Sequence, residues 1–158
     1  MRELITSWIA IIGLLLVAAV VTPARALPSL DLAVIVNPAT RVSHMSAVEM
    51  ETMFTRAQTR WSDGTPIVPL NAPPGTEARI AFDRAVLRLN PDDVGRFWID
   101  RRIRGLGLPP RQLAEPGSVM RVVEKLNGTI SYVPESLVLH NGKVKVVARI
   151  RQGKVVPP

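Results

Sequence analysis

The chain has 158 residues, 47% of them hydrophobic and 21% charged, which favours one globular domain and excludes a disordered or collagen-like chain. It contains no cysteine, so a disulfide scaffold, a thiolate zinc site and a cysteine nucleophile are excluded. The 20 Lys and Arg residues outnumber the 13 Asp and Glu residues and give a net charge of +7, which draws attention to anionic ligands and partners.

Residues 1–26 have the pattern of a secretory signal peptide. An apolar run extends from Ile9 to Val21, and Ala24 and Ala26 supply the small residues that a signal peptidase requires. We therefore expect cleavage before Leu27, a mature domain of residues 27–158 in the periplasm, and no membrane span after cleavage. The alternative is an uncleaved membrane anchor, because residues 4–21 reach the lower limit of a spanning length.

The mature chain begins with a predicted strand and a predicted helix. Leu32–Val36 is a continuous apolar run rich in β-branched residues, which is typical of a strand buried on both faces. Ser46 and Glu49 have the spacing of a capping box, which predicts a helix that starts after Ser46. Its apolar face is expected to contain Ala47, Met50, Phe54 and Ala57.

A second strand, a loop and a second helix follow. Residues 67–70 predict a short strand, in which Pro69 indicates a sheet edge or an irregular ladder. The loop from Asn71 to Thr76 contains Gly75, and Thr76 is a good N-cap for the next helix. The buried stripe of that helix is predicted to consist of Ala78, Phe82, Ala85, Val86 and Leu89.

The rest of the chain continues this alternation. Pro91 fits the first turn of a third helix, with an apolar face formed by Val94, Phe97 and Trp98. Pro116-Gly117 is expected to turn into a fourth helix that is capped by Ser118. Short strands are predicted at residues 112–114, 129–133 and 144–150, with a turn at Asn141-Gly142.

Alternating strands and helices predict an α/β fold, a three-layer sandwich with helices on both faces of a mixed sheet. Ligands of such folds bind beyond the carboxyl ends of strands, near helix N-termini. This rule points to the loop that follows Leu70.

Two stretches carry a family resemblance: Trp61-Ser-Asp-Gly64, shortly after Phe54, and Gly128-Thr-Ile-Ser-Tyr132. Together with Gly75-Thr76 at a helix start, they resemble the second lobe of the phosphate-type periplasmic solute-binding proteins. These are ABC transporter substrate-binding proteins with a type 2 periplasmic-binding-protein fold. The resemblance implies a single-lobe short form that binds a small oxyanion such as phosphate, without a cofactor, for delivery to an ABC transporter.

The resemblance places Gly75 and Thr76 at the ligand, at the start of the helix that Thr76 caps. Arg79 lies one turn further along that helix, where it would add a charge-assisted hydrogen bond, and Asn71 at the start of the loop completes the predicted set of ligand-binding residues. A helix N-terminus offers unpaired N–H groups and a partial positive charge to an anion. Pro73 and Pro74 stand where the family has polar donors. The alternative is that Thr76 caps a helix that binds nothing, since such caps are common.

A second hypothesis comes from the arginines. The family closes two lobes on its ligand, whereas a mature chain of this length would form one. Such a lobe could instead be a ligand-free module that docks on an envelope or sensor protein through Arg101, Arg102 and Arg104. No catalytic or metal-binding motif is evident, so we expect no enzyme activity and no metal site. Nucleic-acid binding would require a cytosolic protein, which the predicted export argues against.

Overall fold

The computed structural model describes residues 30–139 and 142–158. The predicted signal peptide and Asn141 of the predicted turn lie outside the described residues. The helical elements are α1 (Ala47–Phe54), α2 (Glu77–Phe82), the π-helix η1 (Asp83–Leu87), α3 (Pro91–Ile103), α4 (Pro116–Lys125) and the 3-10 helix η2 (Glu135–Leu137). The strands are β1 (Leu32–Val36), β2 (Val68–Asn71), β3 (Arg111–Gln112), β4 (Thr129–Pro134), β5 (Lys145–Arg151) and β6 (Lys154–Val156).

The strands form one mixed sheet in the order β3-β2-β4-β1-β5-β6. β2 pairs in parallel with β3 and β4, whereas β1 pairs antiparallel with β4 and β5. Pro69 lies just before the two residues of β2 that β3 covers, so its missing N–H interrupts no bond to β3. At Pro69 only β4 pairs with β2, so the strand is locally a sheet edge, which agrees with the first of the two alternatives that Pro69 predicts. β6 and η2 were not predicted.

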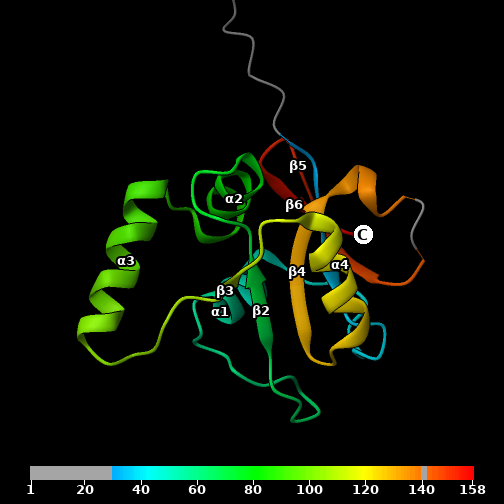
Figure 1. Cartoon of the computed structure of the whole chain (residues 1–158), viewed down its shortest axis with the longest axis horizontal. Coiled ribbons are helices and arrows are strands. Elements are labelled where there is room, and N and C mark those ends of the chain that lie inside the picture. The colour runs from blue at the N-terminus through cyan, green and yellow to red at the C-terminus, as the bar shows by residue number, and fades with distance from the viewer. Residues whose placement is uncertain (1–29, 140–141) are drawn as a thin grey trace, which may run out of the picture.

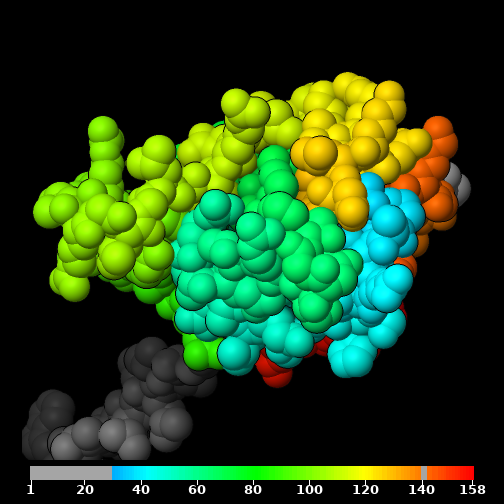
Figure 2. Space-filling view, turned by 90° about the horizontal axis from the view of Figure 1, so that it is seen from below, coloured from blue at the N-terminus to red at the C-terminus, as the bar shows by residue number. Residues whose placement is uncertain are grey.

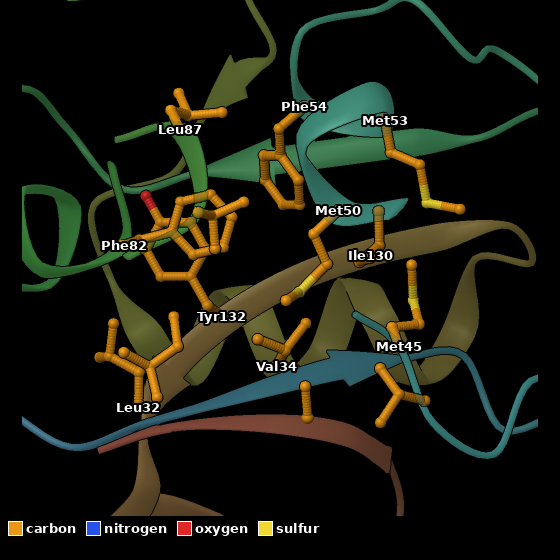
Figure 3. Packing of buried hydrophobic residues seen from close by; sticks show 14 of the residues in the cluster. Leu32, Val34, Met45, Met50, Met53, Phe54, Phe82, Leu87, Ile130 and Tyr132 are labelled. Atoms are coloured by element: carbon orange, nitrogen blue, oxygen red, sulfur yellow. The ribbon is translucent and has the colours of Figure 1, made fainter. Parts of the chain in front are cut away.

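Each face of the sheet buries its own hydrophobic core, because side chains alternate along β1. Leu32, Val34 and Val36 face the larger core, to which α1, α2, η1 and α3 contribute. Figure 3 shows Leu32 and Val34 of this core with Phe54 of α1 and Phe82 of α2. Ala33 and Ile35 face the smaller core, which α4 covers (Figure 1). The predicted three-layer α/β sandwich is therefore confirmed.

The predicted helix starts follow local capping signals in three of four helices. The Ser46–Glu49 capping box is present, Thr76 caps α2, and Asn90 caps α3. The prediction for α4 was wrong, because Glu115 is its N-cap position and Pro116 occupies the first turn. Ala57 lies beyond the end of α1 and is exposed.

The second helix also differs from a regular α-helix. α2 ends at Phe82 and continues as a π-helix over Asp83–Leu87, which ends where Arg88 adopts a left-handed conformation. Phe82, Val86 and Leu87 remain buried in the larger core. The π-turn therefore keeps the predicted stripe facing the sheet while it shifts the position of Asp83.

The part of the chain that the structure describes contains neither a candidate membrane span nor a candidate metal site. None of the helices in the described part of the chain has both the length and the apolarity that a membrane span requires. Nor do residues 30–139 and 142–158 bring together three or more His, Cys, Asp or Glu side chains in the manner of a metal site.

Candidate functional site

The predicted ligand loop begins at the carboxyl end of β2, where β4 lies beside it (Figure 1). Asn71 is the last residue of β2 and is buried beside Tyr132 of β4. The Tyr132 hydroxyl donates to Asn71 Oδ1 over 3.2 Å and accepts the Ala72 N–H, also over 3.2 Å. Burial raises the pKa of Tyr132, so the phenol stays protonated and can donate this bond. Asn71 and Tyr132 thus fix the start of the loop.

The loop then turns sharply at Gly75. The Thr76 N–H donates to the Pro73 carbonyl over 3.4 Å, which closes a four-residue turn around Pro74 and Gly75. Gly75 has φ +80°, a value that glycine adopts without steric cost. A Cβ at Gly75 would have no atom within 4 Å, so the backbone here is open to an approaching ligand.

The Thr76 hydroxyl stabilises this loop because it both donates and accepts a hydrogen bond. The hydroxyl donates to the Pro73 carbonyl over 2.8 Å and accepts the Arg79 N–H over 3.3 Å. Its proton is therefore directed to the loop itself. Thr76 stabilises the turn and caps α2 in this structure.

Arg79 is buried inside the protein and is paired there. Its Nε donates to Asp83 Oδ2 over 2.6 Å, and its Nη1 donates to the Ala72 carbonyl over 3.3 Å. Burial raises the pKa of Asp83, and the Arg79 guanidinium offsets this rise only in part. The guanidinium thus ties α2 to the loop and to the π-helix.

The site leaves both side-chain and backbone donors free. Asn71 Nδ2 and Arg79 Nη2 have no hydrogen-bond acceptor among the described residues. Within the described residues, the N–H groups of Gly75, Glu77 and Ala78 have no hydrogen-bond acceptor. Glu77 and Ala78 belong to the first turn of α2, where such groups are unpaired by the geometry of a helix. These three amides are the backbone groups of the site that can bind an anion.

A pocket of about 140 Å³ adjoins the loop on its α3 side. Gly75, Arg79 and Asp83 lie in its wall together with residues of α3 and of the segment before β3. The remaining lining residues are Pro74, Ile80, Pro91, Val94, Gly95, Trp98, Pro109 and Gln112. The pocket is mainly apolar, and its polar side chains, those of Arg79, Asp83, Trp98 and Gln112, come from four different elements.

The three arginines of the second hypothesis lie at the end of α3, which stands beyond α2 at the side of the molecule (Figures 1 and 2). Arg101 donates to the Leu106 carbonyl over 3.0 Å and lies over the Phe97 and Trp98 rings. Arg104 pairs with Asp100 over 2.9 Å at the surface. Arg102 is exposed. The structure therefore gives Arg101 an internal role and leaves Arg102 and Arg104 exposed at the surface.

The structure brings Asn71, Gly75, Thr76 and Arg79 into one loop-and-helix unit, and it adds three residues that sequence reasoning missed. Asp83 and Trp98 line the pocket, and Tyr132 holds the loop. The spacing of four residues between Arg79 and Asp83 is a signal for their pairing. Nothing in the sequence placed Trp98 beside them.

No protein-family model matches the chain, and no curated protein matches its sequence. Solved structures do match it. A protein from Clostridium perfringens, described as a phosphate ABC transporter substrate-binding protein and solved with bound phosphate, is 18% identical, with a TM-score of 0.59. An ABC-type phosphate transport receptor from Vibrio cholerae is 13% identical, with a TM-score of 0.59. PstS from Borrelia burgdorferi is 11% identical, with a TM-score of 0.59.

Each of these alignments covers 77% of this chain but only 46%, 47% and 48% of the respective structure. The chain thus spans about half the length of the proteins that it matches. At these identities the likeness shows a shared fold, and it confirms the predicted resemblance to one lobe of the phosphate-type binding proteins. The described neighbours are transport proteins rather than enzymes.

Proposed function

We propose that the protein is an exported, phosphate-type solute-binding lobe that holds a small oxyanion such as phosphate at the start of α2. The observation that carries this proposal is the set of three unpaired N–H groups, at Gly75, Glu77 and Ala78, beside an open glycine at the carboxyl end of β2. Amide donors of this kind bind phosphate without a positively charged side chain. The fold shared with phosphate-binding proteins supports the proposal.

The ligand-binding residues then divide into two groups. Gly75 allows the anion to approach the backbone and contributes its own N–H. Asn71, Thr76 and Arg79 act on the shape of the loop through their hydrogen bonds to Tyr132, Pro73 and Ala72. Delivery of the anion to an ABC transporter, and a periplasmic location after removal of residues 1–26, belong to the same proposal.

Phosphate binding can be tested on a chain of residues 27–158, because both described cores are built from residues within this range. We expect phosphate at millimolar concentration to raise the melting temperature, since a ligand that binds only the folded state stabilises it. Gly75→Asp should abolish the rise by placing a carboxylate beside the amides. Gly64→Asp is the matched control, since Gly64 also has a positive φ and open space. An unchanged melting temperature of the wild-type chain would overturn the proposal.

Exposed apolar side chains favour a second candidate function, docking on an acidic envelope or sensor protein. We call residues 96–108 the α3 arm; it forms a protrusion in Figure 2. Ile103 is 81% exposed and Leu108 is 65% exposed, although large apolar residues are normally covered. A groove of about 730 Å³ lies beneath the arm, between Leu108 and the start of β2.

Docking can be separated from anion binding by charge reversal on the α3 arm. Arg102→Glu combined with Arg104→Glu should abolish cross-linking to the acidic partner in a periplasmic extract and leave phosphate binding unchanged. Arg121→Glu on α4 is the matched control, because it reverses an exposed arginine on the opposite face of the sheet. Cross-linking that persists in the double variant would contradict the docking function.

A further inference from the structure

Helix α3 carries a ridge of uncharged residues that the fold leaves exposed. The ridge consists of Pro91, Gly95, Ile99 and Ile103, which follow one another at intervals of four residues and are all exposed. Ile99 is 62% exposed and Ile103 is 81% exposed, although large apolar residues are normally covered. The buried residues of α3 lie on its other side. The described chain therefore covers one apolar face of this helix and leaves a second one open.

The charges of α3 are divided between its two ends. Asp92 and Asp93 lie in the first turn, and Arg101 and Arg102 lie in the last turn. Asp93 pairs with Arg96 over 3.2 Å. The side chains of Asp92 and Arg102 are exposed and have no ion pair or hydrogen bond within the described residues. The helix thus offers a free carboxylate at one end and a free guanidinium at the other.

A helix with this division of charge is complementary to a second copy of itself in the antiparallel orientation. Full overlap of two α3 helices places Pro91 of one copy beside Ile103 of the other, since these residues are the ends of the helix. The free Asp92 of each copy then meets the free Arg102 of the other. A two-fold axis relates the copies, so every contact occurs twice. In the parallel orientation, by contrast, like charges would meet at both ends.

Gly95 provides the space that such a contact requires. Full antiparallel overlap places Ile99 of one copy beside Gly95 of the other, where a Cβ would have no atom within 4 Å. Without a side chain at this position the two helices can approach closely. A glycine in the middle of an exposed helix is otherwise unfavourable, so its place on the ridge calls for a packing reason.

We infer that two copies of the protein pair through antiparallel α3 helices, with the ridges in contact and an Asp92–Arg102 ion pair at each end. Figure 1 shows α3 at the outer edge of the molecule, so a second copy can lie alongside it. The pairing does not depend on anion binding. It uses the surface that the second candidate function gives to an acidic protein, and the two partners would compete for it.

The size of the contact sets the expected affinity. α3 has 13 residues and is therefore about 20 Å long. A contact of one such helix is smaller than the roughly 800 Å² per partner of a standard interface, so we expect a reversible dimer with a micromolar dissociation constant. Sedimentation velocity on residues 27–158, from about 1 to 500 μM, spans this range.

The ridge is tested by removing its two large side chains. Ile99→Ser combined with Ile103→Ser should weaken dimerisation at least about tenfold, because the apolar area that the contact buries is lost. Both residues are exposed in the single chain, so the fold should keep its stability. Val48→Ser is the matched control, since Val48 is an exposed β-branched residue of α1 and should leave the dimer unchanged.

Charge exchange tests the antiparallel orientation. Asp92→Arg alone and Arg102→Asp alone should each weaken the dimer at least about tenfold, because like charges then meet at both ends. An equimolar mixture of the two variants should dimerise again, since each mixed pair has opposite charges at both ends. The restored dimer also shows that neither substitution has unfolded α3.

The remaining outcomes overturn the inference. A wild-type chain that stays monomeric up to the highest concentration overturns the dimer, whether or not phosphate raises the melting temperature. A mixture of the charge variants that stays monomeric overturns the antiparallel contact. A monomeric wild-type chain whose cross-linking to an acidic protein is lost in Arg102→Asp and retained in Asp92→Arg assigns α3 to that partner instead.

Discussion

Asn71 and Tyr132 are 61 residues apart in the chain, yet their side chains share a buried hydrogen bond of 3.2 Å at the carboxyl ends of two neighbouring parallel strands. The Tyr132 ring also stacks on Phe82, with ring centroids 4.0 Å apart and an interplanar angle of 8°. One aromatic residue of β4 therefore contacts both ends of the site, the loop through its hydroxyl and α2 through its ring.

The first prediction concerns this hydroxyl. Tyr132→Phe keeps the stacked ring but leaves Asn71 Oδ1 and the Ala72 N–H without their partner. We expect the free energy of unfolding to fall by about 1–3 kcal/mol, the usual cost of unsatisfied buried groups. Urea denaturation measures this loss. Equal stability of the variant and the wild type would show that water replaces the phenol at no cost.

The second prediction concerns Gly128, the residue before β4. Its φ is +80°, and a Cβ here would collide with the Pro66 carbonyl oxygen. Its carbonyl accepts the Trp61 Nε1–H over 3.0 Å and the Val68 N–H over 2.9 Å, so the backbone cannot move away without losing these bonds. Gly128→Ala should destabilise the fold by about 3 kcal/mol or more in chemical denaturation.

A matched glycine isolates the steric part of this effect. Gly153 also has a positive φ, of +72°, but an added Cβ would have open space around it. Gly153→Ala should therefore cost only about 1 kcal/mol, the penalty of the left-handed backbone alone. Similar losses in the two variants would contradict the close approach of Gly128 to Pro66.

The third prediction concerns acid stability. Glu135 accepts hydrogen bonds from Arg149 Nε over 2.7 Å and from Arg151 Nη2 over 2.6 Å. The bonds from Arg151, more than those from Arg149, hold the pKa of Glu135 below its ordinary value of 4.5. The folded state therefore binds a proton less readily than the unfolded state, and stability falls as the pH drops below 4.5 through the lowered pKa.

Glu135→Gln removes this proton-linked contribution. We expect a loss of about 1 kcal/mol or less at pH 7, because Arg151 is half exposed, and a weaker dependence of stability on pH below 4.5. Unfolding free energies measured from pH 3 to 7 test both points. Glu51→Gln on α1 serves as the control, and an identical pH profile for Glu135→Gln and the wild type would refute the assignment.

The fourth prediction concerns the charge at the mouth of the proposed anion site. Glu77 is exposed in the first turn of α2, and its carboxylate repels an anion bound to the neighbouring amides. Glu77→Gln should therefore strengthen phosphate binding by roughly threefold at low salt, and less at high salt. Calorimetric titration with phosphate measures the change. Glu115→Gln, also at an exposed position, should leave the affinity as it is.

Local signals predicted most of the fold. β1 has the predicted bounds, since a run of five apolar residues can be buried only as a central strand. α1 and α2 begin where Ser46 and Thr76 provide caps, because capping depends on residues three positions apart. The start of α4 was predicted wrongly because two local signals compete there. Pro116 favours the first turn of a helix, and Ser118 favours an N-cap two residues later.

The site was predicted only in part. The sequence identified the loop and Gly75, because glycine and the helix cap mark a turn that opens a helix. It did not reveal that the Arg79 side chain is buried on Asp83, since burial depends on what α3 and the loop place over it. The sequence did not predict the π-helix that begins at Asp83 either, because tertiary packing of Phe82, Val86 and Leu87 sets its geometry.

The amino-acid sequence by itself thus determined the order of the elements, the caps and the turn at Gly75, all of which depend on neighbouring residues. Only the tertiary structure decided which polar groups are paired and which remain free. Asp83 and Trp98 line one pocket although they are distant in the sequence, and their Oδ1 and Nε1 atoms have no hydrogen-bond partner within the described residues. The Gly75, Glu77 and Ala78 amides stay unpaired because no described part of the chain brings an acceptor to them. The physical reason is that satisfaction of a hydrogen-bonding group depends on its three-dimensional surroundings, which local sequence patterns do not encode.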